Sequence, residues 1–564
     1  MTTTETEYRS TPPNQTVRHF RQSLLWPLRL MPLPRGTGPY AKPWELLQAM
    51  GDRSPWRPVV HDHCDGDTRL AERHYNEFVS FLPYVQRFLY GEGLDPRGKA
   101  QGQRGSPMRV FRRQDIAAVR LTPRPGDAPV VLSIVRADLY FFLDVDLVLF
   151  NLEVSADNLH LHQAQELLYR FGRAYPGGWD ADGEPQHCLA NAEWLDAHGA
   201  VLARSDAHDR EAFLSHVAEH RAPRIAAHWA CMLEPLVGDH SGREGDLRYR
   251  QIEYYRMPVM AYLALDDPRA LSRADFVRLG LVTGAGGSSG AEATTLPYAE
   301  DYLADFEKRF CYDRFWSDGG SAPRTRYLCS GHSLVVVGQA DSTFYGCSDR
   351  GVLAQFRHQH FLMFLIAHFQ KAALMMYSDR LVEALKNLDI GSADSVRLFK
   401  RAIRGSFESF LRFTHRYWFH EISEQAQMRA LWHMTARHLD LDPLYDEVKE
   451  RIGDMNQYLE SDSLRRQANT VVRLTVVTIF GLIGTVTTGF LGMNLLAEAD
   501  APLSRKLTIF AVVFVVTTAL TVYTMAKSKR LSDFLDVLSD ERATPWQKCL
   551  AFAAVWRRDS LRAD

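Results

Sequence analysis

Two uncharged stretches near the C-terminus decide how this chain is built: LTVVTIFGLIGTVTTGFLGMNLL at 474–496 and LTIFAVVFVVTTALTVYTMA at 507–526. The first has 23 residues and the second has 20. At about 1.5 Å of rise per residue, a helix of either length crosses a hydrocarbon core of about 30 Å. We therefore predict two transmembrane helices, at 471–496 and 507–526, joined by an external loop at 497–506.

Basic residues flank this hairpin at both of its outer ends. Three arginines precede the first stretch, and three basic residues follow the second: Arg465, Arg466, Arg473, Lys527, Lys529 and Arg530. An excess of Lys and Arg marks the cytoplasmic side of a membrane span. The pattern predicts a multi-pass protein of the cell (inner or plasma) membrane with both termini in the cytoplasm.

The remainder of the chain has the composition of a large cytoplasmic body. Of 564 residues, 46% are hydrophobic, and outside the two stretches no other long uncharged segment occurs. The formal net charge is −2, and no block of Lys and Arg suggests binding to nucleic acid. The seven cysteines show no CxxC spacing, which favours reduced thiols in a cytoplasmic compartment.

Residue patterns divide this body into strands followed by helices. The first 55 residues are rich in Pro, Thr and Arg and are expected to be loosely structured. Runs rich in Val, Tyr and Phe at 110–119, 130–135 and 139–154 predict strands, and patterns of helical spacing fill 353–388, 396–439 and 443–469. We expect an α/β domain in which a sheet packs against helices, with one long helix continuing into the membrane. The predicted segments are an α/β domain with insertions at 56–395, long helices at 396–470, the membrane hairpin, and a basic cytoplasmic tail at 527–564.

The first apolar stretch ends in the tripeptide Gly492-Met493-Asn494, followed by a short acidic loop. A C-terminal two-span hairpin with this tripeptide at the end of its first helix resembles the CorA family of magnesium and divalent-cation transporters. The resemblance implies a funnel-shaped homopentamer, without enzymatic activity, that conducts Mg²⁺ or Co²⁺ across the lipid bilayer. It also implies a pore lined by the first span, an external selectivity filter at the tripeptide, and closure by intracellular Mg²⁺ bound to the cytoplasmic domain.

The chemistry of the tripeptide and its loop suits a hydrated ion. Mg²⁺ dehydrates reluctantly, so uncharged amide and backbone oxygens that hydrogen-bond to its water shell can capture and release it. Asn494 and the carbonyl of Gly492 supply such oxygens, although Gly and Asn are also common where helices end. Rings of Glu498 and Asp500 would raise the cation concentration at the mouth, unless they are simply solvated loop acids.

One face of the first stretch is a candidate pore lining. Leu474, Thr478, Leu482, Thr485 and Gly489 recur at steps of three and four, which places them on one side of a helix. Leucine rings can gate a pore by excluding water, and threonine hydroxyls can contact a hydrated ion. An alternative interpretation is that the small residues of this segment serve close helix packing.

The positions of regulatory metal sites do not follow from the sequence. Acidic residues are abundant at 440–462, and Asp446, Glu450 and Asp454 are candidates for regulatory carboxylates. Two further interpretations remain: a zinc or other transition-metal transporter of the same superfamily, and a membrane-anchored soluble enzyme or sensor. An anchor differs from a pore in that it tolerates Asn494→Ala.

Three other motifs are better explained as ordinary structure. His216-Val-Ala-Glu219-His220 matches the HxxEH pattern of some metalloproteases, but the sequence shows no evident third ligand. The run HDHCDGD at 61–67 is interpreted as an exposed polar turn, and GAGGSSG at 284–290 lacks the glycine spacing of a nucleotide-binding loop.

Overall fold

The chain forms two compact units in a computed structural model, residues 1–452 and 453–564. The structure describes residues 15–34, 42–59, 75–91, 106–252, 256–285, 299–386, 388–389, 393–492, 502–505, 507–508, 511–512, 515–516, 518–519 and 523.

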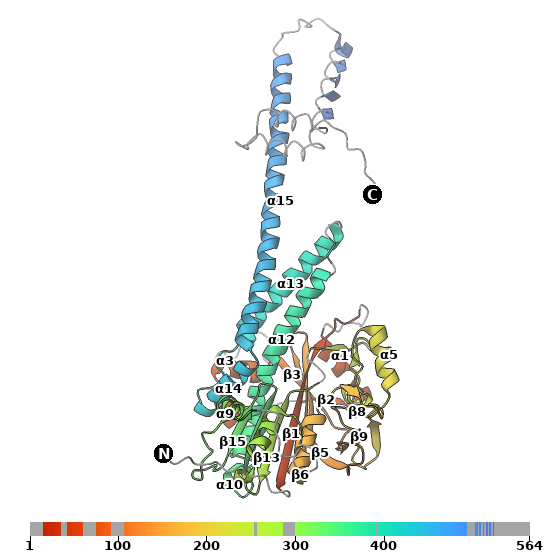
Figure 1. Cartoon of the computed structure of the whole chain (residues 1–564). Coiled ribbons are helices and arrows are strands. Elements are labelled where there is room, and N and C mark those ends of the chain that lie inside the picture. The colour runs from red at the N-terminus through yellow and green to blue at the C-terminus, as the bar shows by residue number, and fades with distance from the viewer. Residues whose placement is uncertain are drawn as a thin grey trace. The chain divides into compact units, whose positions relative to one another are not determined.

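The first unit is built on one mixed sheet, which Figure 1 shows with helices packed around it. Its central path runs β10-β9-β4-β5-β6-β1-β13-β16-β15-β14, and four short strands pair beside it. The path strands are β1 (Thr16–Leu30), β4 (Ala118–Thr122), β5 (Val130–Phe142), β6 (Leu147–His160), β9 (Asn191–Leu195), β10 (Val201–Arg204), β13 (Val259–Leu265), β14 (Cys311–Tyr312), β15 (Arg326–Cys329) and β16 (Ser333–Gln339). The others are β2 (Trp56–Pro58), β3 (Met108–Arg113), β11 (Val237–Gly238) and β12 (Arg248–Gln251), and β7 (Gly178–Trp179) pairs with β8 (Pro185–Gln186) separately.

Helices lie between the strands of this sheet in the chain and also follow the last of them. The smaller ones are α1 (Pro43–Ala49), α3 (Pro83–Tyr90), α4 (Leu161–Arg170), α5 (Arg210–His220), α6 (Ala227–Leu233), α7 (Arg273–Leu281), α9 (Glu300–Phe310), α10 (Thr343–Gly346) and α11 (Val352–Gln355). A π-helical turn, Phe356–His360, then leads into α12 (Phe361–Lys386). The last helices are α13 (Ala393–Tyr417), α14 (Ala426–His438) and α15 (Leu441–Gly492).

The expected α/β body is therefore present. The run anticipated at 130–135 lies within β5. The run at 139–154 is divided between the end of β5 and β6, and the run at 110–119 is divided between β3 and β4. The helical pattern at 396–439 corresponds to two helices, α13 and α14, rather than to one.

The N-terminal region differs from the sequence-based expectation. Residues 16–30, expected to be loosely structured, form β1 at the centre of the sheet, where it pairs antiparallel with both β6 and β13. Its basic residues made the segment look polar. Arg21 and Arg29 point away from the apolar core and pair with acids far away in sequence, at Glu153 and at Asp379 with Glu383.

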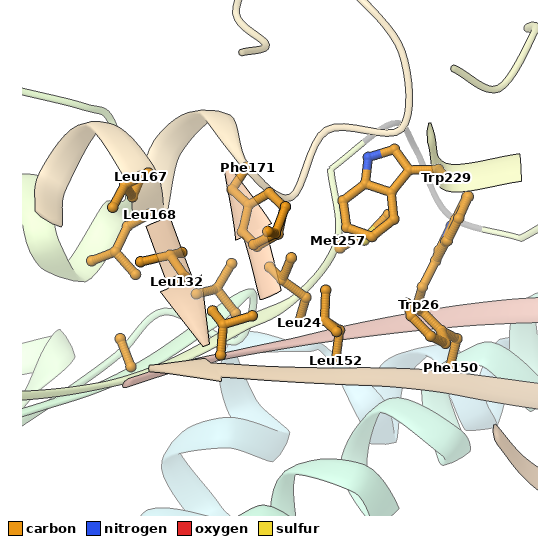
Figure 2. Close-up of a cluster of buried hydrophobic side chains, with 14 of the residues drawn as sticks. Leu24, Trp26, Leu132, Phe150, Leu152, Leu167, Leu168, Phe171, Trp229 and Met257 are labelled. Carbon is orange, nitrogen blue, oxygen red and sulfur yellow. The ribbon is translucent and has the colours of Figure 1, made fainter. Parts of the chain in front are cut away.

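One face of the sheet carries the apolar core, which Figure 2 shows between the strands and the helices above them. Leu24 and Trp26 of β1 lie opposite Leu152 and Phe150 of β6, and all four are buried. The rings of Trp26 and Trp229 meet edge to face with centroids 6.2 Å apart. Because strand side chains alternate between faces, the same strands present polar residues to the other side of the sheet.

That second face carries a buried cluster of charges. The carboxylate of Glu153, 1% exposed, lies 3.2 Å from a guanidinium nitrogen of Arg21, 2.7 Å from Arg136 and 3.3 Å from Arg357 of the π-helical turn. Burial alone raises the pKa of Glu153, but the surrounding guanidinium groups outweigh burial and hold it below its ordinary value. This cluster joins the strands to the helical layer through Arg357.

Candidate functional site

The helix α15 is the structural element that carries most of the predicted site. It runs without interruption over 52 residues, Leu441–Gly492, which corresponds to about 78 Å at 1.5 Å per residue. Its first three turns bury Leu441, Val448 and Ile452 on one face. No proline follows Pro443 within this helix, so nothing in the sequence forces it to break before Gly492.

The five predicted pore-lining residues all lie within α15. Their spacing places Leu474, Thr478, Leu482, Thr485 and Gly489 along one side of the helix. In the single chain Leu474 is 68% exposed and Leu482 is 65% exposed. Exposed large apolar side chains in such a row indicate a surface that lipid or another protein chain covers.

The threonines of this segment already satisfy their own hydroxyl donors. The hydroxyls of Thr475, Thr478, Thr485 and Thr488 each donate to the backbone carbonyl four residues earlier, at 2.9 Å in every case. This back-bonding allows a hydroxyl to sit in an apolar environment without an unpaired donor. The oxygen lone pairs remain available to accept hydrogen bonds from water or from a hydrated ion.

The predicted filter lies at the limit of the described structure. Gly492 is the last described residue of α15, and Met493, Asn494, Glu498 and Asp500 lie outside the described residues. For the second apolar stretch, the described residues at 507–508, 511–512, 515–516, 518–519 and 523 are helical.

The candidate regulatory acids do not form a metal site within one chain. Asp446, Glu450 and Asp454 are exposed, and their spacing of four places them on the side of α15 opposite Val448 and Ile452. Among the described residues, no group of three His, Cys, Asp or Glu side chains could hold a metal ion. Any inner-sphere site at these acids would need ligands from elsewhere.

A different helix has the length and composition of a membrane span. Within the described part of the chain, only Val352–Lys386 is long and apolar enough, and most of it is buried in the first unit. This segment comprises α11, the π-helical turn and α12. The core helix of a soluble domain has the same properties, and α12 buries residues such as Phe364, Ile366 and Phe369. The described apolar part of α15 is the shorter segment Thr470–Leu482.

The remaining motifs show no catalytic arrangement in the described residues. His216 and His220 of α5 have ring centroids 4.6 Å apart, and burial, helped by His220 and Arg224, lowers the pKa of His216. The run at 61–67 lies outside the described residues, as do 286–290 of the glycine-rich segment. The backbone N–H of Ala285 donates to Glu166, which ties the start of that segment to α4.

A cavity of about 780 Å³ in the first unit lies beside α5 and was not predicted from sequence. His216 lines it together with several arginines that already have carboxylate partners. Arg224 pairs with Asp206 at 2.6 Å, and Arg250 pairs with Asp239 at 2.6 Å. These pairs offset part of the basic charge of the lining, which also includes Arg53 and Arg221.

Comparison of the chain with known protein families, curated proteins and solved structures finds no match to any of them.

Proposed function

We propose that the chain is one subunit of a homopentameric, CorA-type channel that carries divalent metal cations, chiefly Mg²⁺, across the plasma membrane. The observation that carries the proposal is the uncharged segment 474–496, through which the described part of α15 runs as far as Gly492 of the Gly-Met-Asn tripeptide. The second uncharged stretch returns the chain to the cytoplasmic side. In this arrangement the first unit is the cytoplasmic body, and α15 leads from it to the pore.

The exposure of α15 supports an assembly rather than an isolated chain. Val471, Leu474 and Leu482 are each more than three-fifths exposed in the single chain. A helix that is apolar around its circumference needs lipid on one side and other helices on the other. Five copies would turn one face of each helix toward a common axis and leave the outer faces to the second span and the lipid.

The side chains on the proposed inner face match the transport of a hydrated ion. Rings of Leu474 and Leu482 would form apolar constrictions that close the pore by excluding water. Thr478 and Thr485 would offer hydroxyl oxygens next to these rings. At the outer end, Asn494 would hydrogen-bond to the water shell of Mg²⁺.

The test is cation influx into proteoliposomes under an inside-negative potential. A potential of 100 mV favours entry of a divalent cation by about 4.6 kcal/mol, twice the value for a single charge. We expect Mg²⁺ influx in the wild type and its loss in Asn494→Ala. Influx of Zn²⁺ without Mg²⁺ would instead identify a transition-metal transporter, and an absence of flux for Mg²⁺, Co²⁺ and Zn²⁺ would favour a membrane anchor.

A matched pair of threonine variants tests the pore face. Thr485 lies on the proposed lining, whereas Thr487 is two residues on, which corresponds to about 200° around the helix. We expect Thr485→Val to reduce Mg²⁺ influx several-fold and Thr487→Val to leave it close to the wild type. Equal effects of the two substitutions would refute the assigned face.

A further inference from the structure

One side of α13 carries a strip of exposed charges, called here the α13 strip. Its members follow one another at steps of three or four, which places them on one side of the helix: Arg397, Arg401, Arg404, Glu408 and Arg412. The opposite side of the helix is buried through Ile403, Phe410 and Phe413. The α13 strip therefore faces away from the body of its own unit.

The central charges of the α13 strip have no ionic partner in their own chain. Arg404, Glu408 and Arg412 form no ion pair with a described residue. Arg412 contributes to the positive field around Asp144, but that carboxylate already pairs with Arg416 at 2.7 Å. Three exposed charges thus follow one another along the helix in the order positive, negative, positive.

The first turns of α15 carry a second strip, called here the α15 strip, whose charges have the opposite order. Asp446, Lys449 and Glu450 are exposed and lie within about 100° of one another around the helix. The side of α15 that carries Val448 is buried instead. None of the three charged residues forms an ion pair with a described residue. The order of the charges along α15 is negative, positive, negative.

One stacking contact fixes how α13 and the first turns of α15 lie along each other. The rings of Phe410 and Tyr445 stack with centroids 5.8 Å apart. The two helices run in opposite directions (Figure 1), and His420, which follows α13, accordingly contacts Asp442, which precedes Tyr445. Heights along both helices can therefore be measured from the contact between Phe410 and Tyr445.

Charges of opposite sign lie at similar heights on the two helices. Counted at about 1.5 Å per residue from the stacking contact toward the end of α15, the heights are about 9 Å for Arg404 and about 7.5 Å for Glu450, about 3 Å for Glu408 and about 6 Å for Lys449, and about −3 Å for Arg412 and about 1.5 Å for Asp446. The two heights in each pair differ by no more than about 5 Å, a distance that the long side chains of Lys and Arg can span.

We propose that the α13 strip of one subunit binds the α15 strip of a second copy of this chain, with three pairs of opposite charge: Arg404 with Glu450, Glu408 with Lys449, and Arg412 with Asp446. The contact rests on the proposed function in one respect, since it needs subunits that stand side by side around an axis along α15. Rotation about such an axis leaves the height of every residue unchanged, so the strips of neighbouring subunits meet in the register found within one chain. Because the strips lie on different sides of the unit, the contact can repeat from subunit to subunit around a ring.

The charge pattern determines the register of this contact more than its strength. A single exposed ion pair contributes little to stability, because water and salt compete with it. A displacement of α13 by about one helical turn toward the base of α15 would place Arg404 beside Lys449 and Glu408 beside Asp446, and both are pairs of like charge. The alternating signs therefore select one alignment of the two helices. In this alignment Asp446 and Glu450 neutralise arginines of the neighbouring subunit and do not bind a metal ion.

The test is chemical coupling of the full-length protein in detergent with a carbodiimide, which joins a carboxylate directly to a lysine amine as an amide. We expect the wild type to form an amide between Glu408 and Lys449, the central pair of the two strips. Mass spectrometry should find this link in the gel band of two joined chains and not in the band of single chains. Glu408→Lys combined with Lys449→Glu should form the same link with the two groups exchanged.

The charges on either side of this pair test whether the pattern aligns the helices. Arg404→Glu with Arg412→Glu leaves the reacting groups in place and should reduce the yield of the link by about fivefold or more. Addition of Asp446→Arg and Glu450→Arg should restore the yield. Arg210→Glu, which changes an exposed arginine of α5 outside both strips, is the control and should leave the yield unchanged.

Failure of this contact and failure of the proposed function are distinguishable, because Mg²⁺ influx into proteoliposomes is measured separately. Influx without the link between chains would overturn the contact alone, whereas the link without flux of any cation would support the contact and count against the channel. A link between Glu408 and Lys449 within single chains only would overturn the contact, as would equal yields in the wild type and the double arginine variant. Coupling of Glu408 to a lysine of 527–564 would also overturn it and assign the C-terminal segment to the α13 strip.

Discussion

Three buried histidines predict that the cytoplasmic body loses stability in mild acid. Burial lowers the pKa of His228 to about 3, that of His360 to about 4 and that of His368 to about 3. An imidazole in an unfolded chain has a pKa of about 6.5. Between these values the unfolded state takes up protons that the folded state does not, so the free energy of unfolding falls as the pH falls below about 6.5.

The size of the effect follows from the proton balance. Each such histidine changes the free energy of unfolding by about 1.4 kcal/mol per pH unit. At pH 5, about 1.5 units below the unfolded pKa, each contributes a loss of about 2 kcal/mol. The three together approach about 6 kcal/mol, which is comparable with the whole stability of a typical domain, about 5–15 kcal/mol.

The assay is urea unfolding of the full-length protein in detergent at pH 7 and pH 5, read by pulse proteolysis. His228 suits the test because its Nδ1 is buried without a partner among the described residues, so its replacement removes no side-chain hydrogen bond at that atom. The free energy of unfolding of the wild type should differ between pH 7 and pH 5, and we expect His228→Leu to reduce this difference by about 2 kcal/mol. The exposed His198→Gln serves as the control. Equal stability of the wild type at pH 7 and pH 5 would refute the assignment of these histidines as buried neutral groups.

Three further predictions concern packing and charge in the same unit. Leu152→Ala should cost about 2–5 kcal/mol in urea unfolding, because Leu152 is fully buried in the core; a loss below about 1 kcal/mol would contradict that placement. Gly338→Ala should lower the free energy of unfolding by about 1–3 kcal/mol, because a Cβ there would overlap the buried ring of Tyr345. Unchanged stability would show that this ring can move. Glu153→Gln should lower the free energy of unfolding by about 3 kcal/mol, because three guanidinium groups would lose their shared counter-charge. The control, Glu219→Gln, changes an exposed residue and should leave the free energy of unfolding unchanged. The same small effect from both substitutions would argue against the buried cluster.

The helical part of the predicted site could be anticipated because helix formation is a local property. Each backbone hydrogen bond in α15 joins residues four apart, so an unbroken pattern from Leu441 to Gly492 is visible in the sequence itself. The spacing that places Leu474, Thr478 and Leu482 on one face is equally local. The uncharged stretches and their basic flanks likewise need no knowledge of distant contacts.

The prediction that residues 16–30 are loosely structured is wrong because the burial of a strand depends on the strands and helices beside it. Arg21 and Arg29 suggest an exposed segment until Glu153 and Asp379 are brought beside them by pairing with β6 and packing against α12. Those partners lie far away in the chain, on elements that follow β1 by more than a hundred residues. From residue 22 to residue 30, β1 is buried on both faces. A central strand whose buried cations depend on distant partners is therefore ambiguous from sequence alone.

The sequence by itself determined the two apolar stretches, the Gly-Met-Asn tripeptide and the long helical pattern that leads to it, since each depends on residues that are close together in the chain. Only the tertiary structure decided that β1 is the centre of the sheet and that Phe410 of α13 stacks on Tyr445 of α15. The physical reason is that burial, charge pairing and unsatisfied hydrogen bonds arise between residues that folding alone brings together, and no local pattern records them.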